Sequence, residues 1–221
     1  MSVRIPVWDA PVRLFHWALA ALVVFSFITG KVAGEWLEWH MRSGYAILTL
    51  LLFRLAWGIV GSRTARFASF VRGPGSVRAY LRDARIRPRP IPGHNPLGGW
   101  SVVAMLAALL TQAISGLFVD DEISTQGPLA AKVSNAVVGR MSALHGYNEW
   151  VVVSLVALHV AAIAYYQWGM RIDLVGPMLH GRTLVAEPWK PSPQRSSGLA
   201  LFVAALAAAF VYWLVVLYPR G

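Results

Sequence analysis

Apolar residues gather in five blocks of about twenty residues, separated by shorter polar stretches. A helix needs about 20 apolar residues to cross the roughly 30 Å hydrocarbon core of a bilayer. The blocks repeat Leu, Ala, Val and Phe and hold no proline beyond a first residue, which favours helices over barrel strands. The pattern predicts an all-α membrane helical bundle with spans at residues 11–30, 39–61, 96–119, 143–168 and 198–218.

The segments between the blocks carry turn-forming and charged residues. Asp9 followed by Pro11 is typical of a helix cap with a first-turn proline. Residues 77–86 are expected to form a short surface helix with arginines toward lipid headgroups, and the proline-rich residues 87–96 an extended connector. The segment of residues 120–142 is long enough to form a small cap over the non-cytoplasmic face of the bundle. We expect one domain without an internal repeat, with the fifth helix as an appendage because its block lacks His and all charged residues.

The net charge of +10 is explained by where the basic residues lie. Loops rich in Lys and Arg stay in the cytoplasm. The loop after the second block is such a loop, and its arginines are Arg63, Arg66, Arg72, Arg78, Arg82, Arg85, Arg87 and Arg89. This predicts a cytoplasmic N-terminus and, after five crossings, a C-terminus on the outer side. Membrane lipid is therefore the expected partner, and a nucleic-acid role has little support.

Cysteine is absent, which excludes disulfides, thiolate-bound metals, iron–sulfur clusters and covalent haem attachment. A metal would have to be held by histidine or carboxylate. The first block resembles a secretory signal in position, but cleavage would discard His16 and the aromatic residues beside it, so we expect a retained helix.

Four histidines lie within or at the ends of the apolar blocks, where ionisable side chains are rare and usually functional. His145 and His159 are fourteen residues apart, so a helix would separate them by roughly 21 Å and turn them to within about 40° of one direction. His16 begins the first span on the cytoplasmic side, and His40 begins the second on the outer side. Two pairs at equal depth result, His16 with His159 and His40 with His145.

Such pairs are typical of two haems, each with its iron between two imidazoles. Iron ligated in this way has no open position, which suits one-electron transfer better than oxygen binding. Each histidine alone could instead be a core residue bonded to a carbonyl or hydroxyl group, but matching depth pairs favour ligation. A non-haem di-metal site is disfavoured because the two layers are about 20 Å apart and Glu149 is the only carboxylate within these spans.

Three arginines near the ends of the spans could neutralise haem propionates: Arg13, Arg42 and Arg54. Extension of these side chains toward lipid headgroups is the alternative. His94 and His180 lie in predicted cytoplasmic loops without a partner at equal depth, and we expect both to face solvent. No residue is assigned a catalytic role.

These residues resemble the bacterial cytochrome b561 group and the b-type cytochrome subunits of nickel–iron hydrogenases. The resemblance covers about the first 182 residues and rests on 7–17 (VWDAPVRLFHW), 40–45 (HMRSGY), 54–58 (RLAWG), 158–160 (LHV) and 177–181 (PMLHG). It implies a four-helix core at 1–182 with two b haems ligated by His16, His40, His145 and His159. Residues 183–221 would then be a cytoplasmic linker and an additional C-terminal transmembrane helix.

The resemblance also implies transfer of electrons between membrane quinone or quinol and a partner on the periplasmic side of the bacterial inner membrane. The acidic residues Asp120, Asp121 and Glu122 would suit a lysine-rich c-type cytochrome or another periplasmic redox subunit, although a loop that only avoids positive charge on that side fits equally. Relatives that oxidise superoxide with quinone suggest an oxidoreductase as the alternative. A non-redox anchor or transporter remains the third hypothesis.

Overall fold

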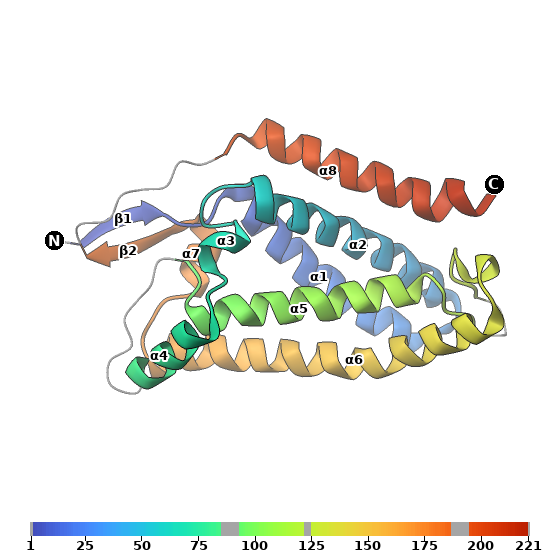
Figure 1. Ribbon diagram of the computed structural model, residues 1–221, viewed down its shortest axis with the longest axis horizontal. Coiled ribbons are helices and arrows are strands. Elements are labelled where there is room, and N and C mark those ends of the chain that lie inside the picture. The colour runs from blue at the N-terminus through green and yellow to red at the C-terminus, as the bar shows by residue number, and fades with distance from the viewer. Residues whose placement is uncertain (1, 85–92, 122–124, 187–194, 221) are drawn as a thin grey trace. The chain divides into compact units, whose positions relative to one another are not determined.

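The computed structural model describes residues 2–84, 93–121, 125–186 and 195–220. Within these ranges five helices are long and apolar enough to cross a membrane. They are α1 (Ala10–Val32), α2 (Leu37–Val60), α5 (Pro96–Gly116), α6 (Asn135–Ala164) and α8 (Ser197–Tyr212) (Figure 1). The prediction of an all-α membrane protein with five spans is confirmed.

The helix ends differ from the ends of the apolar blocks. α6 begins at Asn135 and not near residue 143, because its first two turns are too polar to belong to an apolar run. α6 and α8 continue into π-helical turns at Tyr165–Gly169 and Trp213–Leu217. A 3₁₀ turn at Gly34–Trp36 precedes α2, with Gly34 at a positive φ that favours glycine.

Shorter elements occupy the connections. They are α3 (Phe67–Phe70), α4 (Pro74–Ala84), the 3₁₀ turn Ala130–Lys132, α7 (Val175–His180) and the strands β1 (Ser2–Pro6) and β2 (Arg182–Ala186). The surface helix expected at 77–86 is α4, which begins earlier, with proline at its first position. The predicted connector at 87–96 lies mostly outside the described residues.

The strands β1 and β2 form an antiparallel pair that the sequence did not indicate to us (Figure 1). Ser2 pairs with Ala186 and Pro6 with Arg182. Gly181, with φ of 82°, turns the chain from α7 into β2, a conformation that glycine adopts easily. The pair joins the start of the chain to the segment after α7, and the domain boundary predicted after residue 182 stays a prediction.

The chain divides into two compact units, which are described separately. Unit 1 comprises residues 1–14, 55–105 and 155–200, and unit 2 comprises 15–54, 106–154 and 201–221. Each of the five long helices contributes residues to both units.

Unit 1 is organised around a buried carboxylate, that of Asp9. Its Oδ1 accepts a hydrogen bond from the Val12 amide at 2.9 Å, so the predicted cap of α1 is confirmed. Its Oδ2 accepts bonds from Trp57 Nε1 at 3.0 Å and from the Ser62 hydroxyl at 2.5 Å. The side chain of Asp9 therefore ties the start of α1 to the end of α2.

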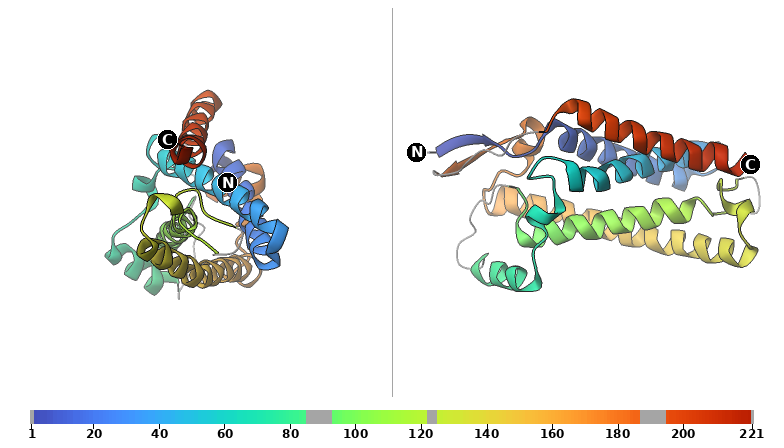
Figure 2. Two further views of the ribbon diagram at one scale, coloured as in Figure 1. Left: turned by 90° about the vertical axis from the view of Figure 1, so that its right-hand side faces the viewer. Right: turned by 45° about the horizontal axis from the view of Figure 1, so that its top comes forward.

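Unit 2 has an apolar core in which α8 takes part. Val211 of α8 is 3% exposed and belongs to one buried cluster with Leu48, Leu117 and Leu129. Figure 2 shows the unit 2 part of α8 near that of α2, in agreement with the contact of Val211 with Leu48. The fifth helix is therefore packed against its neighbours in this unit and not only surrounded by lipid.

Candidate functional site

His40 of α2 and His145 of α6 lie close together in unit 2. Their ring centroids are 6.1 Å apart and the ring planes are nearly perpendicular, at 87°. Both side chains are half-buried. Of the two histidine pairs expected from depth, this is the pair whose members lie in one unit.

Both imidazoles are held by a backbone carbonyl group of a neighbouring helix. Nδ1 of His40 lies 2.8 Å from the Ser26 carbonyl oxygen in α1, and Nδ1 of His145 lies 3.0 Å from the Gln112 carbonyl oxygen in α5. A carbonyl oxygen only accepts, so Nδ1 of each ring carries the hydrogen. In the neutral ring the lone pair is then on Nε2, which is the form that binds a metal ion.

The separation of the two rings fits a metal ion between them. A bond from a metal to imidazole is about 2 Å long, and the ring centre lies about 1 Å behind the nitrogen. Two such ligands on opposite sides of an ion would place their centroids about 6 Å apart, close to the 6.1 Å observed. The carbonyl contacts alone would also suit ordinary core histidines, and the distance between the two rings is what distinguishes this pair.

A haem iron would need only two ligands from the chain. In the part of the chain that the structure describes, no three His, Cys, Asp or Glu side chains come together as a possible metal site. Sites built from side chains use three or four such ligands, whereas a porphyrin supplies four nitrogens and leaves two axial positions. His40 and His145 are the two residues that would supply those ligands.

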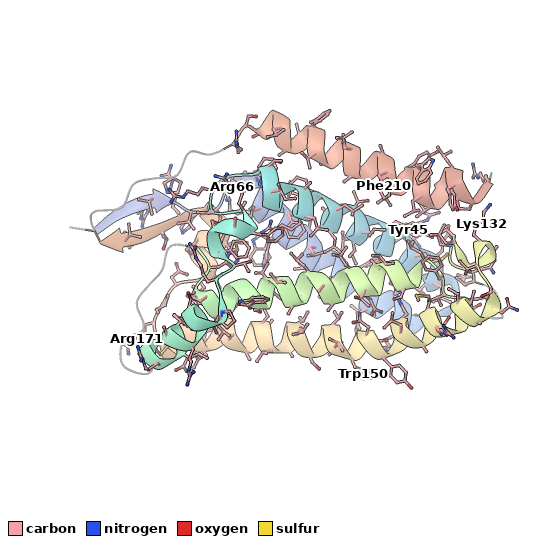
Figure 3. All side chains as sticks on the ribbon, viewed as in Figure 1. Tyr45, Arg66, Lys132, Trp150, Arg171 and Phe210 are labelled. Carbon is pink, nitrogen blue, oxygen red and sulfur yellow. The ribbon has the colours of Figure 1, made fainter. Side chains whose placement is uncertain are left out.

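The carboxylate of Glu149, which lies one turn beyond His145, is engaged elsewhere. It forms an ion pair with Lys31 of α1 at 2.5 Å, and the Lys31 ammonium group also lies 5.6 Å from the ring centre of Trp150. Figure 3 shows Trp150 projecting outward from α6, in agreement with its 63% exposure. Glu149 therefore stabilises the contact between α1 and α6 in unit 2.

Two amide side chains beside His145 were not predicted from the sequence: Gln112, which is half-buried, and Asn148, which is buried. Gln112 donates from Nε2 to the His145 carbonyl oxygen at 3.1 Å. Asn148 donates to Gln112 Oε1 at 2.8 Å and to the Ala108 carbonyl oxygen at 2.9 Å. Polar amides within apolar spans were the available signal, since such groups need partners in a bilayer.

His16 and His159 fall in different units. His16 is half-buried in the α1 part of unit 2, where its ring lies edge-on to Trp17 with centroids 5.0 Å apart. His159 is half-buried in the α6 part of unit 1. Their pairing as ligands stays a prediction.

The three arginines expected near haem propionates have different surroundings. Arg13 Nη1 donates to the Leu179 carbonyl oxygen at the end of α7. Arg42 pairs with Glu38, one turn earlier on α2, and Arg54 is buried, with 3% exposure. A contact with haem propionates stays a prediction for all three residues. Arg13 and Arg42 would make that contact in addition to those with Leu179 and Glu38.

One expectation about the remaining histidines is wrong. His94 does not face solvent: it is half-buried, with ring centroids 4.7 Å from Trp8 and 4.4 Å from Phe70. Aromatic packing at the start of α5 explains the difference. His180 is exposed, as expected.

The acidic segment after α5 is partly described. Asp121 accepts a bond from the Thr125 amide at 2.8 Å, and Asp120 accepts one from Gln126 Nε2 at 3.0 Å. Glu122 lies outside the described residues. The carboxylates of Asp120 and Asp121 thus both accept hydrogen bonds from residues of the same loop.

Comparison with known proteins assigns the family. The model of the family described as prokaryotic cytochrome b561 matches residues 7–181. A probable Ni/Fe-hydrogenase B-type cytochrome subunit of Azotobacter chroococcum mcd 1 is 26% identical over 208 residues, which cover 79% of this chain and 86% of that protein. A protein of the same description from Rhodobacter capsulatus is 22% identical, with 79% of each chain covered.

A probable Ni/Fe-hydrogenase 1 B-type cytochrome subunit of Escherichia coli (strain K12) is 29% identical over 144 residues, which cover 53% of this chain and 61% of that protein. No solved structure matches the chain. The family match spans the first four long helices and ends before α8. The chain is thus a multi-pass membrane protein that belongs to the prokaryotic cytochrome b561 family.

Proposed function

We propose that this protein carries electrons across a membrane by means of two b haems, each held between two histidines. The observation that carries the proposal is the closeness of the rings of His40 and His145, with centroids 6.1 Å apart and each Nδ1 bonded to a carbonyl group. His16 and His159 would hold the second haem.

Haem iron supplies a one-electron couple when it is bound. The residues of the chain would determine how the iron is ligated and would help to set its reduction potential. His40 and His145 would both hold the haem iron, and the Ser26 and Gln112 carbonyl groups would keep each ring in its ligating form. Both histidines are half-buried, and the burial of a haem helps to set its potential.

The hydrogenase names of the relatives suggest the reaction partners. We propose that the protein accepts electrons from a hydrogenase-type dehydrogenase or another periplasmic redox subunit and exchanges them with membrane quinone. The names of the relatives lend no support to superoxide oxidation. In this proposal the protein resides in the bacterial inner membrane, with a cytoplasmic N-terminus and a periplasmic C-terminus.

Reduction by quinol tests this function. Purified protein in lipid nanodiscs, mixed anaerobically with a short-chain quinol, should show the sharp α-band of reduced low-spin b haem. Protein without quinol is the control for spontaneous reduction, and dithionite sets the full extent. A dithionite-reducible haem that quinol leaves oxidised would contradict the quinone role, and a preparation without a Soret band would contradict the cytochrome proposal as a whole.

Replacement of the acidic segment tests the docking proposal separately. If Asp120, Asp121 and Glu122 attract a basic redox partner, their joint replacement by Asn and Gln should slow electron delivery and reduce its dependence on salt. An unchanged rate at every salt concentration would show that these acids only shape the loop.

A further inference from the structure

The two carbonyl groups that hold His40 and His145 belong to the same local structure, which occurs once in α1 and once in α5. The two segments are 26–30 (SFITG) and 112–116 (QAISG). Each has a hydroxyl residue at its fourth position and glycine at its fifth. No internal repeat was expected from the sequence, and the likeness of these pentapeptides becomes visible only through their contacts.

The hydroxyl group makes the same two contacts in each copy. Thr29 Oγ1 lies 2.9 Å from the Phe25 carbonyl oxygen and 3.1 Å from that of Ser26. Ser115 Oγ lies 2.6 Å from the Thr111 carbonyl oxygen and 3.1 Å from that of Gln112. Both residues are 1% exposed. The carbonyl group at the first position of the pentapeptide therefore meets a hydroxyl group as well as a histidine.

The absence of a side chain on the glycine leaves room for the imidazole ring. A Cβ atom on Gly30 would lie 2.8 Å from His40 Nδ1, and one on Gly116 would lie 3.0 Å from His145 Cε1. Contacts this short require the ring to move. By contrast, a Cβ atom on Gly139 of α6, also in unit 2, would meet nothing within 4 Å.

We propose that Thr29 with Gly30, and Ser115 with Gly116, are positioning residues that set the orientation and the electron donation of His40 and His145. This rests on the proposed function, in which both rings ligate one haem. The glycine admits the ring beside the helix. The hydroxyl group shares the carbonyl lone pairs with Nδ1–H, which weakens that hydrogen bond and makes the imidazole a poorer electron donor to iron.

The glycine part is tested by comparing Gly30→Ala and Gly116→Ala with Gly139→Ala as the matched control. Nearly perpendicular imidazole planes give oxidised low-spin haem a strongly anisotropic electron paramagnetic resonance signal. Gly30→Ala and Gly116→Ala should each shift that signal and lower haem occupancy, while Gly139→Ala leaves both as in the unmodified protein. A shift equal in all three variants, or in none, would overturn the assignment.

The role of the hydroxyl group is better tested at Thr29 than at Ser115. The Thr29 hydroxyl group contacts carbonyl groups and not the His40 ring. Ser115 Oγ also lies 3.3 Å from His145 Nδ1. Thr29→Val keeps the shape and removes the hydroxyl group. It should lower the midpoint potential of this haem, because the Ser26 carbonyl group then accepts more strongly from Nδ1–H and stabilises oxidised iron. Thr29→Ser should restore the potential.

The outcomes separate this inference from the proposed function. Equal potentials in the unmodified protein, Thr29→Val and Thr29→Ser, with haem still lost in His40→Ala, would overturn the positioning role and leave the haem site intact. Full haem content in His40→Ala would instead contradict the haem site itself.

Discussion

At the scale of single residues, the chain relies on polar groups whose partners are distant in sequence. Asp9 shows which of these partners can be predicted from the sequence. The cap of α1 was predictable because Val12 is only three residues away, but Trp57 and Ser62 are brought to the same carboxylate by folding alone. Carbonyl partners such as those of Ser26 and Gln112 cannot be predicted from residue type, since every residue has a carbonyl group.

Asp9→Ala should lower the free energy of unfolding by about 2–4 kcal/mol, because it removes a helix cap and leaves the buried donors of Trp57 and Ser62 without their acceptor. Chemical denaturation in detergent micelles measures this. Asp173→Ala is the control, since Asp173 accepts a bond from the Gly176 amide at an exposed site and should cost no more than about 1 kcal/mol. Equal losses in the two variants would contradict the role of the Asp9 network.

At the scale of elements, apolar runs predicted the five spans because a bilayer imposes one length on every crossing helix. They did not predict the first turns of α6 or the pairing of β1 with β2. Polar helical turns carry no apolar run, and strands of five residues are too short to stand out beside blocks of twenty.

α8 should contribute to stability through its buried side, although it has no chemically active residue. Val211→Ala would leave a cavity beside Leu48 and Leu117 and should cost about 1 kcal/mol, mainly through lost packing contacts, because lipid tails are as apolar as the core. Thermal unfolding of Val211→Ala should therefore begin at lower temperature than that of Leu206→Ala, whose side chain is 56% exposed. The reverse order would show that α8 is not packed through Val211.

The contact of α4 with the end of α6 should depend on pH in the alkaline range. Burial, followed by the 2.8 Å hydrogen bond with Tyr166, raises the pKa of Tyr80 above its ordinary value. The folded state holds this proton more tightly, so its stabilising effect is complete below about pH 10 and is lost as the pH rises further. Tyr80→Phe should flatten this decline relative to Tyr147→Phe, which alters an exposed ring. Identical alkaline profiles would contradict the assignment.

At the scale of the whole molecule, the sequence predicts the orientation in the membrane, and the absence of cysteine makes it easy to measure. A membrane-impermeant maleimide should label Ser134→Cys in intact cells and Ser76→Cys only after permeabilisation, because α4 belongs to the arginine-rich segment. Both residues are exposed. Labelling in the opposite order would place the N-terminus outside.

The most direct test of the account is the number of haems per polypeptide in single and double histidine variants, measured by pyridine haemochromogen assay. We expect two haems in the unmodified protein and one in His40→Ala, in His145→Ala and in the variant that carries both changes, because the two side chains serve the same iron. Combining His40→Ala with His16→Ala should remove both haems. Two haems retained in either single variant, or none left when His40 and His145 are both replaced, would contradict the central claim.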